Sequence, residues 1–209
     1  IGPLQRQFEG RLLCYEGDVR SESSVAQAVR AAAGAFGGLD AAVQNACLCP
    51  FSPFEDTDGD VLKAAFYVNY FGAVNLTRSA APHMRAGGRI LFTSSGVGVT
   101  GFPNLTAYAS TKGAIESLAK CLRLEYARQG LSFHILHPPL TRTRSSAPLP
   151  VPAEFMASPE AVGRGLAKHL FSRHFIICHS PWQRAQTLMC YLAPLKFGSL
   201  MARMTARAN

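Results

Sequence analysis

The chain has 209 residues, of which 48% are hydrophobic and 16% are charged. This length suits one domain with a sizeable core, and the composition excludes an intrinsically disordered protein. The formal net charge of +8 is compatible with an anionic partner. The basic residues form no dense run, however, which favours scattered surface arginines and argues against a nucleic-acid-binding protein.

The six cysteines show no Cys-x-x-Cys pair and no metal-ligand spacing with histidine. We therefore predict reduced thiols in a cytoplasmic protein without a metal site, and we interpret His134 and His137 as structural. The sequence shows no signal peptide, and no apolar run reaches the roughly 20 residues needed to cross a bilayer.

Apolar residues recur at helical spacing in some stretches and form short continuous runs in others. The first pattern predicts helices at residues 1–9, 21–36, 57–84, 106–129 and 158–171. The second predicts strands at residues 11–15, 39–43, 89–95, 131–136 and 175–178. Ser21 and Ser158 are the expected N-caps of their helices, and Gly37 and Gly130 are the expected helix ends.

Tyr108 and Lys112 lie four residues apart in the predicted helix 106–129, so they share one face of it. An ammonium beneath a phenol favours the phenolate and suits the tyrosine for general acid/base chemistry. The spacing alone is common in ordinary helices. Ser95 adds weight because it follows an apolar strand, and open parallel sheets bind ligands at the carboxyl ends of their strands.

Asn69 lies in the middle of the apolar helical pattern 57–84. An asparagine there competes for backbone hydrogen bonds, which predicts a local helix distortion that could hold a water molecule. The alternative is a polar side chain whose hydrogen bonds are satisfied by a neighbouring strand.

Together, the residues Asn69, Ser95, Tyr108 and Lys112, at these spacings, resemble the short-chain dehydrogenase/reductase family. The resemblance implies an α/β fold with a Rossmann-like, doubly wound parallel sheet in a single domain over residues 1–209. It also implies an NAD(P)-dependent oxidoreductase that interconverts a carbonyl and a secondary alcohol by hydride transfer. Tyr108 would transfer the proton, Ser95 would bind the substrate oxygen, Lys112 would favour the phenolate and bind the ribose, and Asn69 would hold a proton-relay water.

By the same resemblance, the cofactor is NADP or NAD, with a slight preference for NADP. Its binding residues would be Asp18, Val19, Asn45, Ala46, Tyr108, Lys112, Pro138 and Thr141. Asp18 would contact the adenine, although it could equally be the end of a strand. Gln44 and Cys47 depart from the family's Asn-Asn-Ala-Gly, and Pro139 replaces a glycine, so the cofactor contacts at these positions are in doubt.

The run Pro138-Pro139-x-Thr141-x-Thr143 resembles the branch that contains 3-ketodihydrosphingosine reductase, which hints at a lipid-like substrate. The following segment, 141–157, is where the family places its substrate loop, and a loop there can gate the site.

Members of this family begin with a strand, a glycine-rich turn and a helix that takes the pyrophosphate, and this sequence shows no such turn before Asp18. We therefore expect an N-terminally truncated domain that lacks the first β-α-β unit. The strand at 11–15 would then be isolated or would pair with the strand at 39–43. An alternative function is a catalytically silent piece that serves only as an interaction or subunit-interface module, and a complete chain is expected to form a homo-oligomer.

The C-terminal segment 183–207 is amphipathic in pieces, with expected breaks at Pro194 and Gly198. Three interpretations are open: the segment packs on its own domain, contacts a second subunit, or lies on a membrane surface.

Overall fold

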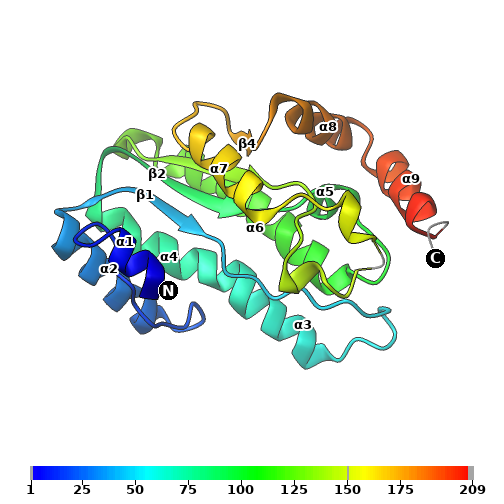
Figure 1. Cartoon of the computed structure of the whole chain (residues 1–209), viewed down its shortest axis with the longest axis horizontal. Coiled ribbons are helices and arrows are strands. Elements are labelled where there is room, and N and C mark those ends of the chain that lie inside the picture. The colour runs from blue at the N-terminus through cyan, green and yellow to red at the C-terminus, as the bar shows by residue number, and fades with distance from the viewer. Residues whose placement is uncertain (1, 150, 207–209) are drawn as a thin grey trace.

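The computed structural model describes residues 2–149 and 151–206. Its centre is a parallel sheet with the strand order β1-β2-β3-β4 (Figure 1). The strands are β1 (Leu39–Gln44), β2 (Met84–Thr93), β3 (Ser132–His137) and β4 (Ile176–Cys178). The inner strands β2 and β3 consist largely of apolar residues because both of their faces are covered.

Helices cover both faces of this sheet. They are α1 (Gly2–Gln7), α2 (Glu22–Phe36), α3 (Gly59–Phe66), α4 (Gly72–Ala80), α5 (Val97–Thr100), α6 (Thr106–Glu125), α7 (Pro159–His169), α8 (Pro181–Leu192) and α9 (Pro194–Ala206). A π-helix, η1 (Tyr67–Phe71), joins α3 to α4. Short 3-10 helices are η2 (Ala81–His83), η3 (Ala127–Gln129), η4 (Arg144–Ser146) and η5 (Ala153–Phe155).

Alternating side chains of the strands divide the core into two layers. Ile90 and Phe92 of β2 pack with residues of α2, α4 and α6 on one face. Leu91, between them in sequence, faces the other way and packs with Leu166 of α7 and with Leu170, which follows that helix. Figure 1 shows α2 and α4 on one side of the strands and α7 on the other. The α/β fold with a parallel sheet and flanking helices is therefore confirmed.

The expected helix ends at Ser21, Ser158 and Gly37 are confirmed, whereas α6 ends at Glu125 and Gly130 ends the 3-10 helix η3 instead. The Ser21 hydroxyl accepts a hydrogen bond from the Ser24 amide at 3.2 Å, and the Ser158 hydroxyl accepts one from the Ala161 amide at 3.2 Å. Gly37 ends α2 with φ of 70° in the left-handed region, where glycine is favoured.

The strand predicted at residues 11–15 is wrong. The structure has no strand between residues 12 and 18, and the side chains of Leu12, Leu13 and Tyr15 are exposed. Within the described residues, β1 pairs with β2 on one side and with no strand on the other. The segment therefore neither extends the sheet nor pairs with residues 39–43.

In the C-terminal segment, the break at Pro194 is confirmed, whereas the break at Gly198 is wrong. Helix α9 runs through Gly198, whose missing side chain allows close approach to α5: a Cβ atom there would lie 2.5 Å from the Thr100 carbonyl oxygen. Arg207, the last residue of the segment, lies outside the described residues. No helix in the described part of the chain is long and apolar enough to span a membrane.

Candidate active site

Helix α6 places Tyr108 and Lys112 on one face beside the carboxyl end of β2. The Lys112 side chain is fully buried, and its Nζ donates a hydrogen bond to the Thr93 carbonyl oxygen at 2.7 Å. The same Nζ lies over the Tyr108 ring, 5.4 Å from the ring centroid. Burial lowers the pKa of Lys112, because the apolar surroundings disfavour the charged ammonium.

The Tyr108 hydroxyl lies beside Ser95 and Cys47. The pKa of Tyr108 is raised, first by burial and then by the neighbouring Cys47 and Cys49 side chains, while hydrogen bonding with Ser95 opposes the shift. This direction is opposite to the expected effect of Lys112. The physical reason is that the phenol is largely removed from water, and this burial is the largest influence on its pKa. Tyr108 is therefore a neutral phenol at pH 7.

Asn69 lies in the π-helix η1, so the predicted helix distortion is confirmed. Its amide group is completely buried, and both of its N–H donors are used. Nδ2 donates to the Leu48 carbonyl oxygen and to the Thr111 hydroxyl, both at 2.9 Å, and Oδ1 accepts from the Leu48 amide at 2.8 Å. These partners belong to the loop after β1 and to α6, rather than to a strand.

Thr111 is a site residue that the sequence reasoning missed. Its hydroxyl receives the hydrogen bond from Asn69 and donates one to the Tyr108 carbonyl oxygen at 2.7 Å. It thereby connects the π-helix to the turn of α6 that carries Tyr108. Its position between Tyr108 and Lys112 was the signal available in the sequence.

Three of the predicted cofactor-binding positions lie at the carboxyl ends of the strands. Asn45 and Ala46 follow β1 and are exposed. The Asn45 Oδ1 accepts a hydrogen bond from the Thr93 hydroxyl at 3.0 Å, and the Thr93 carbonyl is also the partner of Lys112. Pro138 follows β3 and is half-buried. These residues surround the same edge of the sheet as Ser95.

The other predicted cofactor positions make separate contacts. The exposed Asp18 carboxylate forms an ion pair with Arg20 at 2.7 Å, and hydrogen bonds from Arg20 lower its pKa. Val19 packs against α4, and its carbonyl oxygen accepts from the Asn75 amide at 2.9 Å. The Thr141 hydroxyl donates to the carbonyl oxygen of Pro139 at 2.7 Å. No hydrogen bond among the described residues joins these positions to Tyr108.

A second group of polar side chains lies one turn beyond Lys112, and of its members only His137 was singled out from the sequence. Glu116 Oε1 accepts from the Ser94 hydroxyl at 2.9 Å and lies 3.0 Å from His137 Nε2, and Oε2 accepts from the Tyr191 hydroxyl at 2.7 Å. Burial alone would raise the pKa of Glu116, but the contacts with His137, Tyr191 and Ser94 lower it overall. The group ties helix α8 to the ends of β2 and β3.

His137 is buried within this group, and its structural role stays a prediction. No cluster of potential metal ligands is found in the part of the chain that the structure describes.

The donors around Lys112 fit the ribose of a nicotinamide nucleotide. An ammonium has three N–H donors, and one of them binds the Thr93 carbonyl. The other two have no acceptor among the described residues, and adjacent ribose hydroxyls would supply acceptors.

A family model for short chain dehydrogenases matches residues 3–151. The chain belongs to the short-chain dehydrogenase family. It is 38% identical over 129 residues to the oxidoreductase UcpA of Escherichia coli strain K12, a match that covers 60% of this chain and 49% of UcpA. The chain thus spans about half the length of the curated relatives it matches.

Two solved structures with bound nicotinamide nucleotides are similar to this chain. One is a gluconate 5-dehydrogenase from Burkholderia cenocepacia J2315 in complex with NADP and tartrate, at 29% identity and a TM-score of 0.61, covering 66% of this chain and 55% of the other. The second is an NAD+-bound xylitol dehydrogenase, at 30% identity and a TM-score of 0.58, covering 62% of this chain and 51% of the other.

Proposed function

We propose that this short-chain dehydrogenase is an NAD(P)-dependent oxidoreductase that interconverts a carbonyl and a secondary alcohol. The observation that carries the proposal is the meeting of three groups at the end of β2. The Tyr108 phenol lies beside the Ser95 hydroxyl and above the buried Lys112 ammonium. A proton donor, an oxygen-binding hydroxyl and a cation are the groups that this reaction needs from a protein.

In the direction of carbonyl reduction, Ser95 binds the carbonyl oxygen by a hydrogen bond and holds it beside Tyr108. The neutral phenol donates its proton to that oxygen while the substrate carbon gains a hydride, so that one hydride and one proton convert the carbonyl to an alcohol. When bound, the nicotinamide supplies the hydride. Lys112 holds the ribose and stabilises the phenolate that remains, and Asn69 and Thr111 fix the position of Tyr108.

Within this proposal the nucleotide is NADP or NAD, because similar proteins bind one or the other. Asn45, Ala46, Pro138 and Thr141 would contact the nicotinamide end, and Asp18 with Val19 the adenine end.

The substrate would be lipid-like and would pass beneath the segment 141–157. That segment exposes the apolar side chain of Phe155, and the neighbouring Leu140 is also exposed. We place the protein in the cytoplasm and expect the whole protein to form a homo-oligomer.

The proposal is tested by the change Tyr108→Phe, which removes the proton donor and keeps the ring. We expect the turnover of a ketone panel with NADPH or NADH to fall at least about a hundredfold. Tyr126→Phe, at the end of the same helix, is the matched control and should leave turnover unchanged. Turnover retained by the Tyr108 variant would refute the assignment.

Binding of NADPH or NADH to the 209-residue chain, followed by nucleotide fluorescence, separates the enzyme from the alternative of a silent interaction module. Binding supports the enzyme. A chain that folds but binds neither nucleotide would support the module.

A further inference from the structure

Helix α8 turns its polar face toward the protein. The Gln183 amide donates to the His137 carbonyl oxygen at 2.7 Å, and the Tyr191 hydroxyl donates to Glu116 at 2.7 Å. Thr187 is also buried, with its hydroxyl 3.7 Å from the Cys178 sulfur. The hydrogen bonds of this face leave the opposite face of α8 directed at solvent.

That opposite face is apolar, which is the reverse of an ordinary surface helix. The exposed fractions are 74% for Trp182, 43% for Leu188, 49% for Met189 and 86% for Leu192. At 100° per residue these four lie on one side of the helix. Leu195, at the start of α9, is 79% exposed and continues the surface. We call these five residues the α8–α9 patch.

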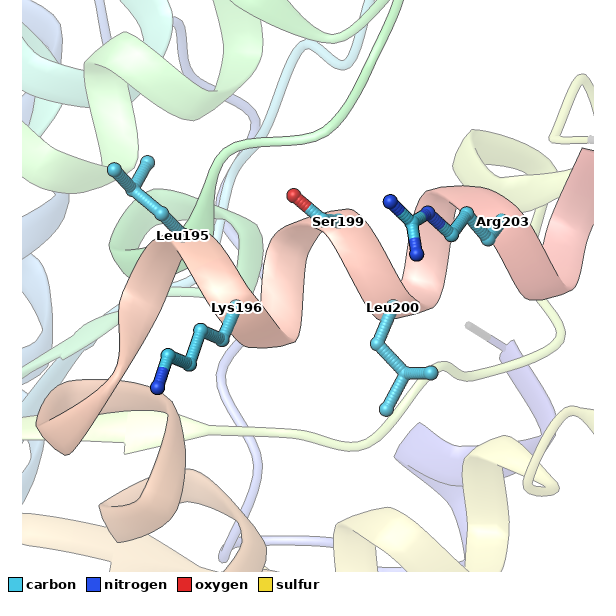
Figure 2. A pocket seen from close by; sticks show the side chains of 5 residues that line it. All are labelled: Leu195, Lys196, Ser199, Leu200 and Arg203. Atoms are coloured by element: carbon cyan, nitrogen blue, oxygen red, sulfur yellow. The ribbon is translucent and has the colours of Figure 1, made fainter.

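Helix α9 adds positive charge next to the patch. The contact of Gly198 with α5 directs the opposite side of α9 outward, where a shallow depression is lined by Leu195, Lys196, Ser199, Leu200 and Arg203. Figure 2 shows Lys196 and Leu200 extending to one side of this helix and Ser199 and Arg203 to the other. Residues 181–206 contain three basic side chains and no aspartate or glutamate.

We propose that α8 and α9 lie on the surface of a membrane that contains anionic phospholipids. Large apolar side chains would enter the boundary between headgroups and acyl chains, and Lys196 and Arg203 would bind lipid phosphates. Tryptophan is well suited to this boundary because its ring is apolar and its N–H is polar.

A second copy of the chain fits the patch less well. In a two-fold contact both copies present the same surface to each other. Lys196 and Arg203 would then approach a partner surface that carries the same two cations. The patch has no carboxylate with which to compensate them. The lack of acidic side chains is a disadvantage in a protein interface and an advantage on an anionic bilayer.

The test uses the complete 209-residue chain and phosphatidylcholine vesicles with or without phosphatidylserine. Trp182 is the only tryptophan in the sequence, so its emission reports directly on the patch. We expect a blue shift and co-flotation with vesicles that contain phosphatidylserine, and weaker binding at high salt.

Two double variants separate the apolar and the electrostatic contributions. Lys196→Gln with Arg203→Gln should weaken binding about fivefold for each charge removed, or about 25-fold together. Leu192→Ser with Leu195→Ser should weaken it at least about tenfold.

Matched controls lie on α6 and η3, outside the α8–α9 patch. Leu124 is 79% exposed on α6, so Leu124→Ser should bind as the wild type does. Lys120→Gln with Arg128→Gln removes two exposed charges outside the patch and should weaken binding much less than the pair on α9.

Three results would overturn the proposal. The first is the absence of a blue shift with every vesicle, and the second is binding that the control variants weaken as much as the patch variants do. The third is a dimer in size-exclusion chromatography that Leu192→Ser with Leu195→Ser dissociates, together with no vesicle binding, which would assign the patch to a second copy. None of these readouts depends on catalytic activity.

Discussion

Replacing Asn69 with alanine is expected to destabilise the protein far more than an ordinary substitution of a helical asparagine. The amide of Asn69 makes three hydrogen bonds in a completely buried position, two with the Leu48 backbone and one with Thr111. Alanine makes none of them. The change therefore removes the side-chain hydrogen bonds that join Leu48 to the π-helix and the π-helix to α6.

The size of the effect follows from these contacts. At about 1 kcal/mol for each hydrogen bond, the loss is about 3 kcal/mol. Leu48 is 39% exposed, so water can reach its backbone and reduce the penalty. Thr111 is fully buried, and its hydroxyl still has the Tyr108 carbonyl as a partner. We expect a decrease of about 2–4 kcal/mol in the free energy of unfolding.

Urea unfolding followed by circular dichroism measures this decrease, with Asn75→Ala as the matched control. Asn75 lies on the continuation of the same helix and makes one side-chain hydrogen bond, to the Val19 carbonyl oxygen at 2.9 Å. Both changes introduce the same gain in helix propensity, which cancels in the comparison. Asn75→Ala should lower the free energy of unfolding by about 1 kcal/mol. A decrease for Asn69→Ala that is no larger than this would refute the prediction.

Three further predictions concern packing, pH and reactivity. Gly98→Ala should lower the melting temperature, because the new Cβ would lie 2.7 Å from the Cβ of Lys112 on α6. Gly59→Ala is the control and should leave the melting temperature unchanged, because a Cβ there meets no atom within 4 Å. Equal melting temperatures of the two variants would contradict this prediction. The contacts that lower the pKa of Glu116 contribute stability that is present above its unfolded pKa of about 4.3 and is lost as the pH falls through the folded value. Between about pH 5 and 3, the unfolding free energy of Glu116→Gln should therefore change less than that of the wild type. Urea titrations measure this difference. Burial raises the pKa of Cys47, so at pH 7 iodoacetamide should label the exposed Cys121 before Cys47. Mass spectrometry measures the two rates, and faster labelling of Cys47 would contradict the buried environment of its thiol.

The wrong strand at residues 11–15 shows what a local pattern cannot supply. Leu12, Leu13 and Tyr15 have strand-forming side chains, but a strand also needs a partner, and β1 accepts only β2 within the described residues. Pairing is decided by segments far apart in sequence, which composition does not reveal. The expected helix break at Gly198 was wrong for a related reason, because Gly198 is needed for the close approach of Thr100 from another helix.

The candidate site was predictable where one element carries the spacing. Tyr108 and Lys112 share a helix face, and Ser95 follows a strand, so their relative positions follow from regular geometry. Glu116 was not recognised, because its partners His137 and Tyr191 lie 21 and 75 positions away and meet it only through the packing of the sheet.

The π-helix between α3 and α4 has a consequence for the length of this segment. Helix α3 packs on α6, while α4 packs on α2, so η1 lies between two helix interfaces. A π-helix fits about one residue more into a turn than an α-helix does. Deleting one residue within Tyr67–Phe71 would therefore restore a regular helix and leave Ala73, Thr77 and Ala80 buried, but it would move Asn69 away from Leu48 and Thr111. The extra residue of this turn thus serves the hydrogen bonds of Asn69 rather than the packing of the two helices.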